Sequence, residues 1–351
     1  MSDTSSATSL VARFGSGAGH LSRLWPGFSL SALLAMAATF VSTMHGGPQL
    51  LYALFFGVAL HHLSGEAKSR SGIEFCSRTL LRLGVGLLGA RITAAQIAGL
   101  GWTTAAVVIL GVTSTIGMAL VFGRRLGMTK PQSVLSGGAV AICGASAALA
   151  ISAVLPRDKE SDRFTLMVVV TVTVLSTIAM VVYPLIAKLL HLPPELAGLF
   201  LGGTIHDVAQ VVGAGYTIDQ HTGDVATVVK LFRVAMLTVV VVAVSAAFKR
   251  SKTASESTSE TSGTGRQPLV PWFLWLFIAM VAVNSLGFIA QPVQDSLNFV
   301  SRACLVVAIS ALGMKTSFMQ LARAGWQPMM LLVAETLWLA VFVLGCALMM
   351  K

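Results

Sequence analysis

Charged side chains are scarce in this sequence. Only 11% of its 351 residues are Asp, Glu, Lys or Arg, whereas 55% are hydrophobic. A soluble domain is usually about a quarter charged, so this composition excludes an ordinary soluble protein. Several apolar runs reach the roughly 20 residues that a helix needs to cross a bilayer. We therefore expect an all-α polytopic membrane protein with about 9–11 transmembrane segments.

Cysteines and catalytic motifs are also scarce. The four cysteines have no CxxC spacing and lie in or beside apolar runs, so we interpret them as small hydrophobic side chains. The sequence contains no HExxH motif, nucleophile elbow, paired aspartate motif or P-loop. We expect no enzyme activity, no metal or other cofactor, and no ATP-driven transport by this chain alone.

The net charge of +10 comes from short basic clusters between the apolar runs. A nucleic-acid partner would require a continuous basic surface, whereas short clusters are typical of cytoplasmic loops. Two such clusters are Arg124, Arg125 and Lys130, and Lys249, Arg250 and Lys252. With these clusters inside, the N-terminus is cytoplasmic and the C-terminus is outside. The expected surroundings are lipid, and no nucleic acid is expected to bind.

The apolar runs divide the chain into spans and connecting segments. The expected spans are 26–43, 49–65, 74–93, 102–122, 164–189, 224–248, 270–289, 298–314 and 327–349. A polar tail at 1–25 precedes a membrane domain at 26–248. The Ser/Thr-rich stretch at 249–268 predicts a flexible cytoplasmic linker, and 269–351 holds the last three spans.

An internal repeat is present. "SRTLLRLGVGLLGARITAAQIAGLGW", from Ser77 to Trp102, aligns without gaps with "SRACLVVAISALGMKTSFMQLARAGW", from Ser301 to Trp326, and 9 of 26 positions are identical. The charge pattern starts the first copy inside and the second outside. An inverted repeat of this kind is typical of secondary transporters.

Two further apolar segments, 132–155 and 195–216, contain double glycines: "LSGGAVAICGASAALA" and "LGGTIHDVAQVVGAG". Each glycine inside a helix costs about 1 kcal/mol relative to alanine. The segments therefore predict glycine-broken helices or re-entrant hairpins, and the alternative is that the glycines only permit close helix packing. Basic residues flank the first segment on both sides, whereas "HLPPE" and "DQHTGD", typical of external loops, flank the other. Two opposed hairpins and two crossing helices fit this charge pattern equally well.

Broken helices would expose backbone N–H groups and a partial positive charge to an anion. Lys230 and Arg233 lie three residues apart on one helix face, and an arginine can donate two parallel hydrogen bonds to an oxyanion. The alternative is that both side chains extend toward the membrane surface. The candidate substrate-binding residues are Gly137, Gly138, Gly144, Ser146, Gly202, Gly203, Thr204, Lys230 and Arg233.

His206 and Asp207 are adjacent titratable residues inside an apolar segment. Ionisable groups at membrane depth are costly, which favours a function for them. We predict that they couple transport to protons, with Gln210 as a nearby hydrogen-bonding group; the alternative is a structural pair. Glu335, a carboxylate well inside the last span, is expected to pair with one of the buried cations.

The repeat, "GGAVAICGASAALAIS" and "GGTIHDVAQVVGAGY" together resemble the YeiH-type inner-membrane family, described as sulfate exporters, from about residue 30 to the end. The "LLGARIT" and "ALGMKTS" copies are similar to the wider cation:proton antiporter and anion transporter superfamily. That resemblance implies an inverted-repeat fold with interrupted helices in a bacterial inner membrane. The order of repeat copies and glycine segments differs here between the two halves, which departs from that superfamily.

The expected function is secondary active transport, as an exporter, of a small inorganic or organic anion. Sulfate and sulfite are suggested by the resemblance. One alternative is a cation/proton antiporter that uses Asp207, and a less favoured alternative is an intramembrane enzyme. The implied partners are the anion, the lipid bilayer and, in a homodimer, a second copy of the chain.

The inverted repeat makes a prediction about topology. Gln96 and Gln320 occupy equivalent repeat positions, and opposite insertion places residue 96 outside and residue 320 inside. Labelling of single cysteines at these positions with a membrane-impermeant thiol reagent should therefore give opposite accessibility. Labelling of both from the same side would contradict the inverted repeat.

Overall fold

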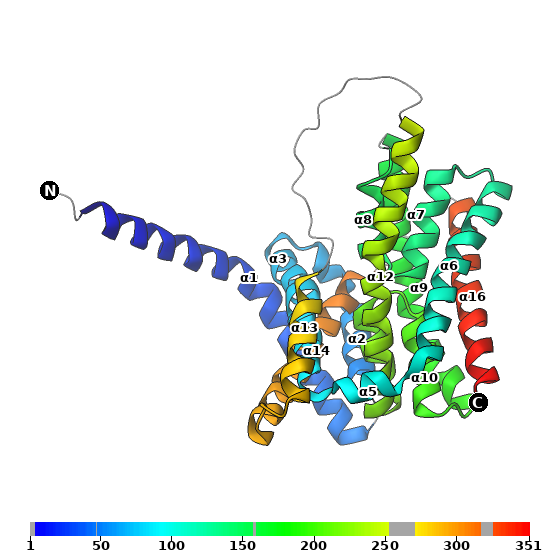
Figure 1. Cartoon of the computed structure of the whole chain (residues 1–351). Coiled ribbons are helices and arrows are strands. Elements are labelled where there is room, and N and C mark those ends of the chain that lie inside the picture. Colours follow the sequence, from blue (N-terminus) through cyan, green and yellow to red (C-terminus); the bar gives the residue numbers. More distant parts are fainter. Residues whose placement is uncertain (1–3, 47, 157–158, 253–270, 317–325) are drawn as a thin grey trace. The chain divides into compact units, whose positions relative to one another are not determined.

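The computed structural model describes residues 4–46, 48–156, 159–252, 271–316 and 326–351, and every element within these ranges is helical. The elements in chain order are α1 (Thr4–His45), α2 (Gln49–Ala59), η1 (His61–Gly65), α3 (Ala67–Phe75), η2 (Cys76–Leu80), α4 (Leu81–Leu88), η3 (Gly89–Arg91), α5 (Ala94–Gly99), α6 (Gly101–Arg125), α7 (Lys130–Ala141), α8 (Ala145–Ser152), α9 (Lys159–Leu189), α10 (Pro194–Thr204), α11 (Val208–Ile218), α12 (Gln220–Lys252), α13 (Trp272–Ser285), α14 (Gln291–Lys315) and α16 (Trp326–Met349) (Figure 1).

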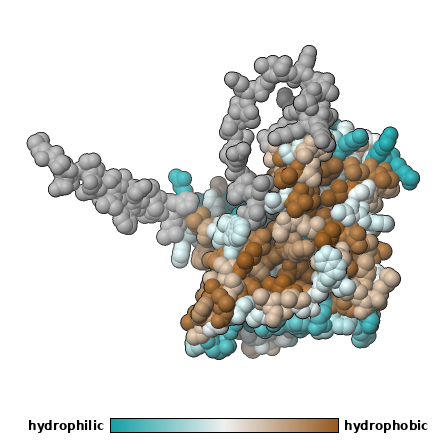
Figure 2. Space-filling model, in the orientation of Figure 1, coloured by the Kyte–Doolittle hydropathy of each residue, from teal (hydrophilic) through white to brown (hydrophobic). Residues whose placement is uncertain are grey.

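Six of the described helices are long and apolar enough to cross a membrane. They are Ser22–His45, Gly101–Arg125, Glu160–Leu189, Gln220–Phe248, Gln291–Lys315 and Trp326–Met349. Large hydrophobic side chains on these helices are exposed, including Leu110, Leu185 and Val341, and Figure 2 shows such residues as brown patches on the viewed face. Exposed apolar surface of this extent suits contact with lipid. The prediction of an all-α polytopic membrane protein is confirmed.

The chain forms two compact units. The first comprises Met1–Leu88 and Gln291–Thr316, and the second comprises Gly89–Ala290 and Ser317–Lys351. Both units therefore combine chain from before and after the predicted linker. Helix α12 continues to Lys252, inside the range predicted as linker, and the remainder of that linker lies outside the described residues.

Small residues bring the helices of the first unit close together. Gly57 on α2 faces Gly313 on α14, where a Cβ on Gly57 would lie 2.9 Å from the Gly313 Cα. Gly27 on α1 faces Gly72 on α3, where a Cβ on Gly72 would lie 2.7 Å from the Gly27 Cα. Apolar lipid gives helices no hydrophobic reason to associate, so close backbone approach of this kind provides much of the packing energy.

The two repeat copies meet within this first unit. Ser301 on α14 donates to the Gly84 carbonyl on α4 at 2.7 Å, and Lys315 on α14 donates to Ser77 on η2 at 3.4 Å. Residue numbers rise along one partner as they fall along the other, so the two copies run antiparallel. Oppositely inserted copies require this arrangement. The later part of the second copy, including Gln320, lies outside the described residues, and the inverted repeat stays a prediction.

In the second unit, the segment predicted at 132–155 is a re-entrant hairpin. Helix α7 ends at Ala141 and α8 begins at Ala145. A Cβ on Gly138 of α7 would overlap the side chain of Ile151 on α8, which is feasible only if α8 turns back along α7. The turn is made by Gly144, whose φ of +63° lies in the left-handed region that favours glycine.

The segment predicted at 195–216 is a second hairpin, made of α10 and α11, and both of its helices pack on α12. Gly198 and Gly202 of α10 face Val225 and Val229 respectively, so α10 runs parallel to α12. Gly215 of α11 faces Gly223, close to the turn that connects these two helices, so α11 runs back. Both glycine segments are hairpins, which decides between the two topologies that the charge pattern left open.

The double glycines do not break the helices. Gly137 and Gly138 lie within α7, and Gly202 and Gly203 lie within α10. A Cβ on Gly137 would lie 2.5 Å from the Ala119 Cβ on α6. The expectation that these four glycines expose backbone at a break is wrong; they permit close packing, and the breaks occur farther along, at residues 142–144 and 205–207.

This packing predicts that adding a single methyl group at Gly202 lowers the stability of the fold. A Cβ on Gly202 would overlap the Ala226 carbonyl oxygen on α12, so Gly202→Ala should push α10 away from α12 and destabilise the fold by about 1–3 kcal/mol. Gly117→Ala in α6 is the matched control, since nothing lies within 4 Å of its Cβ position. Thermal unfolding in detergent should show a lower midpoint for Gly202→Ala alone, and equal midpoints would contradict the packing role.

Candidate functional site

The tips of the two hairpins meet inside the second unit. The first tip is Ile142–Gly144 and the second is Ile205–Asp207. A Cβ on Gly144 would lie 3.3 Å from the His206 Cβ, so the two tips are in contact. In Figure 1, α7 and α8 occupy the upper part of this unit and α10 its lower part, consistent with hairpins that enter from opposite sides.

Lys230, on α12, holds the two tips together. Its side chain is fully buried, and its Nζ donates hydrogen bonds to the Ile142 carbonyl of the first tip and, at 2.9 Å, to the Ile205 carbonyl of the second. The alternative in which this side chain extends toward the membrane surface is therefore wrong. An ammonium group has three donors, and these two bonds use two of them.

Arg233 lies one turn farther along α12 and also donates hydrogen bonds to backbone carbonyls of both hairpins. Its side chain is 1% exposed. Five hydrogen bonds of 2.6–3.2 Å run from its Nε, Nη1 and Nη2 to the carbonyls of Val140, Ala141, Gly202 and Ile205. A guanidinium group has five N–H donors, so none remains for direct contact with an anion.

These two cations satisfy the C-terminal ends of α7 and α10. The last carbonyls of a helix have no partner within the helix and carry a partial negative charge. At membrane depth no bulk water replaces those partners. Lys230 and Arg233 supply both hydrogen bonds and positive charge there. Their hydrogen bonds hold the two tips together, and we call this arrangement the clamp. Because most of their N–H groups are used in this way, a ligand would interact with them mainly through their positive charge.

His206 lies at the second tip and is buried. Its Nε2 is 3.0 Å from the Thr336 hydroxyl on α16, and that hydroxyl donates to the Leu332 carbonyl at 2.7 Å. Because the Thr336 hydrogen is used in this way, His206 Nε2 is the donor in their contact. Its Nδ1 is buried without a hydrogen-bond partner among the described residues.

Asp207 forms the N-cap of α11. Its Oδ1 accepts a hydrogen bond of 2.8 Å from the Ala209 backbone N–H, and its own N–H donates to Ser176 on α9 at 3.0 Å. An aspartate in this position stabilises a helix by about 1 kcal/mol relative to alanine. The structural alternative for this residue thus has a specific basis, and the predicted proton coupling through His206 and Asp207 is not tested by these contacts.

The remaining predicted residues, Gln210, Thr204 and Ser146, lie near the helix breaks but differ in burial and in hydrogen-bond partners. Gln210 is buried and donates to Thr177 on α9 at 2.8 Å, while its Oε1 has no partner among the described residues. Thr204 donates to the Phe200 carbonyl of its own helix at 2.6 Å. Ser146 is exposed in the first turn of α8. Thus Gly144, Thr204, His206 and Asp207 lie at or beside the breaks, and Gln210 and Ser146 lie within the first turns beyond them.

Helix α16 contributes two residues whose contacts the sequence did not reveal. Thr336 reaches the second hairpin through His206, and Glu335 reaches the first hairpin, where Ser136 of α7 donates to its Oε1 at 2.8 Å. The expected pairing of Glu335 with Lys230 or Arg233 is wrong. In the sequence, the only indication that Glu335 and Thr336 contact the hairpins is that they are adjacent polar residues in an otherwise apolar helix.

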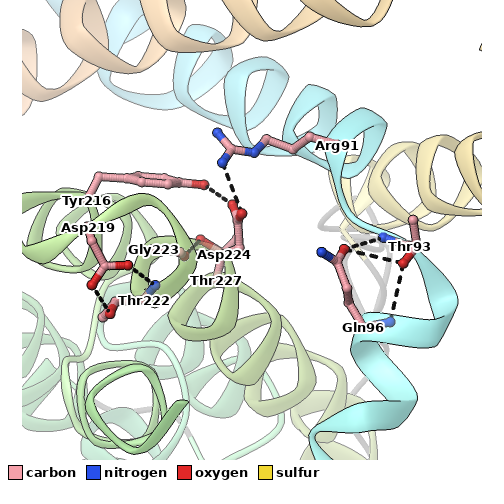
Figure 3. A network of polar contacts seen from close by, with 9 residues as sticks. All are labelled: Arg91, Thr93, Gln96, Tyr216, Asp219, Thr222, Gly223, Asp224 and Thr227. Carbon is pink, nitrogen blue, oxygen red and sulfur yellow. Dashed lines mark hydrogen bonds and ion pairs between the residues drawn. The ribbon is translucent and has the colours of Figure 1, made fainter. Parts of the chain in front are cut away.

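A second polar network fixes the far end of the α10–α11 hairpin (Figure 3). Arg91, on η3, pairs with Asp224 on α12 at 3.0 Å and lies 5.5 Å from the ring centroid of Tyr216 on α11. The Tyr216 hydroxyl donates to the other carboxylate oxygen of Asp224 at 2.6 Å. This network joins η3, α11 and α12, and it uses a residue from the first repeat copy.

A cavity of about 440 Å³ lies elsewhere in the second unit. Its walls come from the α6–α7 connection and the first turns of α7, α9 and α16, and they are Leu126, Gly127, Met128, Gln132, Glu160, Arg163, Phe164, Met167, Gln327 and Pro328. None of these residues belongs to either hairpin tip.

The clamp predicts that Arg233 stabilises the fold. Arg233→Met removes the five hydrogen bonds and leaves buried carbonyls without partners, which should destabilise the protein by about 3–5 kcal/mol. Arg125→Met is the matched control because Arg125 is exposed at the end of α6. Thermal unfolding of both variants in detergent measures the difference, and a wild-type midpoint for Arg233→Met would contradict the clamp.

Comparison with known proteins gives the family. The chain matches the family model described as Conserved hypothetical protein 698 over residues 26–332. It is 47% identical over 330 residues to a UPF0324 membrane protein of Chlorobaculum tepidum, covering 94% of this chain and 90% of that protein.

Two further relatives have similar coverage. Identity to the UPF0324 membrane protein TauZ of Paracoccus pantotrophus is 47% over 326 residues, or 93% of this chain and 95% of TauZ. Identity to the UPF0324 inner membrane protein YeiH of Escherichia coli is 32% over 332 residues, or 91% and 93%. The resemblance found in the sequence is confirmed, and the chain belongs to the UPF0324 family of membrane proteins, to which YeiH also belongs.

Proposed function

We propose that this protein is a secondary transporter of a small anion, which binds where the two hairpin tips meet. The observation that carries this proposal is the pair of fully buried cations, Lys230 and Arg233, bonded to both tips. An anion site between the tips of two opposed hairpins would have a barrier on either side, which supports this proposal. A site with a barrier on either side is what alternating access requires.

The charge at the tips favours an anion. Each helix end carries roughly half an elementary charge, so the two C-terminal and two N-terminal ends cancel to about zero. Lys230 and Arg233 add two positive charges, and Asp207 adds one negative charge. About one net positive charge then remains when His206 and Glu335 are both uncharged. An uncompensated positive charge at membrane depth is unfavourable, and it attracts an anion.

The two helix N-termini at the tips differ in a way that suggests where the anion binds. Asp207 caps α11 with its carboxylate. Gly144 caps α8 and has no side chain to accept a hydrogen bond. Backbone N–H groups at the start of α8 are therefore available to an anionic oxygen. Sulfate and sulfite are the proposed substrates because of the family resemblance, and the names of the relatives specify no substrate.

The alternatives are less well supported. A cation/proton antiporter would need Asp207 to bind the cation, but this carboxylate caps α11 beside two buried cations. An intramembrane enzyme that used His206 and Asp207 would need the Asp207 carboxylate as a reacting group, but its Oδ1 accepts the Ala209 N–H as the cap of α11. Proton coupling through His206 and Asp207 stays a prediction.

A transport assay tests the proposal. Purified protein in proteoliposomes should exchange radiolabelled sulfate or sulfite for the same unlabelled anion. Lys230→Met removes one of the two buried charges and should weaken the apparent affinity by about thirtyfold or more, which corresponds to a loss of about 2 kcal/mol or more.

Lys188→Met is the matched control because Lys188 is exposed near the end of α9, and it should exchange anions like the wild type. Size-exclusion profiles verify that both variants are folded. Absence of saturable exchange of either anion by the wild type, or unchanged affinity in folded Lys230→Met protein, would overturn the proposal.

A further inference from the structure

We infer that Glu335 binds a proton that moves together with the anion. This inference rests on the proposed function, and it assigns the coupled ion and its site. Glu335 lies in the middle of α16, and its side chain is fully buried. Its Oε1 meets the hydroxyl of Ser136, and its Oε2 is buried without a hydrogen-bond partner among the described residues.

Glu335 forms no ion pair with any of the residues that the structure describes. The ion pairs among the described residues are Glu74 with Arg78, Asp224 with Arg91, and Glu195 with His221. A carboxylate buried with one hydroxyl contact and one unpaired oxygen is costly as an anion at membrane depth. Protonation of Glu335 removes that charge and requires no additional space in the packed interior.

The contacts of Ser136 suit two protonation states. Its single hydroxyl hydrogen lies between two acceptors, the Ser133 carbonyl at 3.1 Å and Glu335 Oε1 at 2.8 Å. When Glu335 is ionised, Ser136 donates to it. When Glu335 is protonated, its O–H donates to the Ser136 oxygen and the Ser136 hydroxyl donates to Ser133. The same three groups thus form a complete hydrogen-bonded chain with a proton on Glu335.

Glu335 is connected to both hairpins. Ser136 lies one turn before Val140 and Ala141, whose carbonyls bind Arg233. The next residue of α16, Thr336, contacts His206 at the second tip. A change at Glu335 is therefore transmitted along α16 and α7 to both sides of the anion site.

The helices packed against α16 carry their charged groups near their ends. These groups are Arg124 and Arg125 on α6, Lys130 on α7, Glu160, Asp162, Arg163 and Lys188 on α9, and Glu195 on α10. The titratable side chains nearer the middle are Tyr183 of α9, which packs on Phe200, and Cys143, His206 and Asp207 at the tips. Glu335 is the carboxyl group in the middle of α16.

Proton binding at Glu335 and anion binding at the tips should favour each other. Ionised Glu335 adds a negative charge to the helices that carry the anion site and so opposes anion binding, whereas protonated Glu335 adds none. By linkage, a proton that strengthens anion binding is itself bound more tightly when the anion is present. The proton and the anion are therefore carried in the same direction.

The transport test uses Glu335→Gln, which keeps the shape and neutrality of the protonated side chain. Wild-type proteoliposomes, with the membrane potential clamped, should accumulate labelled sulfate or sulfite when the outside is more acidic. Glu335→Gln should reduce this gradient-driven accumulation at least tenfold. Glu195→Gln is the matched control, since Glu195 is exposed and pairs with His221, and it should accumulate the anion like the wild type.

Infrared difference spectroscopy of the purified proteins tests proton binding without transport. Above about pH 5, where exposed carboxyl groups are ionised, the wild type should show the C=O band of a protonated carboxyl group. The band should be absent from Glu335→Gln and present in Glu195→Gln. Ser136→Ala should shift its frequency, which provides a second readout if Glu335→Gln folds poorly.

The outcomes separate the two proposals. Absence of sulfate and sulfite flux in the wild type overturns the proposed function, and the infrared band still decides whether Glu335 holds a proton. Wild-type accumulation by Glu335→Gln overturns the inference while the transport function stands. A wild-type infrared spectrum without a band that depends on Glu335 and Ser136 also overturns the inference.

Discussion

Two buried cations hold together the part of the structure on which the proposed function depends. Each re-entrant hairpin ends a helix inside the hydrophobic layer, and the terminal carbonyls of that helix have no water to bind. Lys230 and Arg233 donate to carbonyls of α7 and of α10 at once. The same bonds that satisfy the backbone therefore also bring the two tips together and leave positive charge between them.

The glycines and other small residues have a supporting role. At Gly137 and Gly202 the backbone of a hairpin helix comes so close to its neighbour that a single methyl group would collide. This close approach places the tips within reach of α12. Among the glycines of the two hairpins, only Gly144 has a backbone conformation that itself favours glycine. Packing and turn formation are thus assigned to different glycines of the same short segment.

Helix α16 links the clamped tips to a buried carboxyl group. Through Glu335 and Thr336, consecutive residues of one helix contact one hairpin each. Because it contacts both hairpins, α16 can couple a movement of one hairpin to a movement of the other without itself contacting a ligand. The family model, which matches residues 26–332, covers both hairpins and α12 together.

The sequence by itself determined the class of protein, the places of the interrupted segments and the family. Composition and the length of apolar runs are enough for the class, since a helix must satisfy its own backbone in lipid wherever it packs. The double glycines located the interrupted segments, and the resemblance of specific motifs indicated the family. The same argument identified Lys230, Arg233, His206 and Asp207 as unusual, because charge is rare at that depth.

The tertiary structure decided which groups those residues contact. Arg233 binds carbonyls more than 90 positions away in sequence, and Ser136 meets Glu335 at a separation of 199. No local pattern encodes such contacts: a glycine that breaks a helix and a glycine that packs against one are indistinguishable in sequence. The direction of each hairpin and the partners of Glu335 depend on how α12 and α16 pack, and only the folded chain brings those helices together.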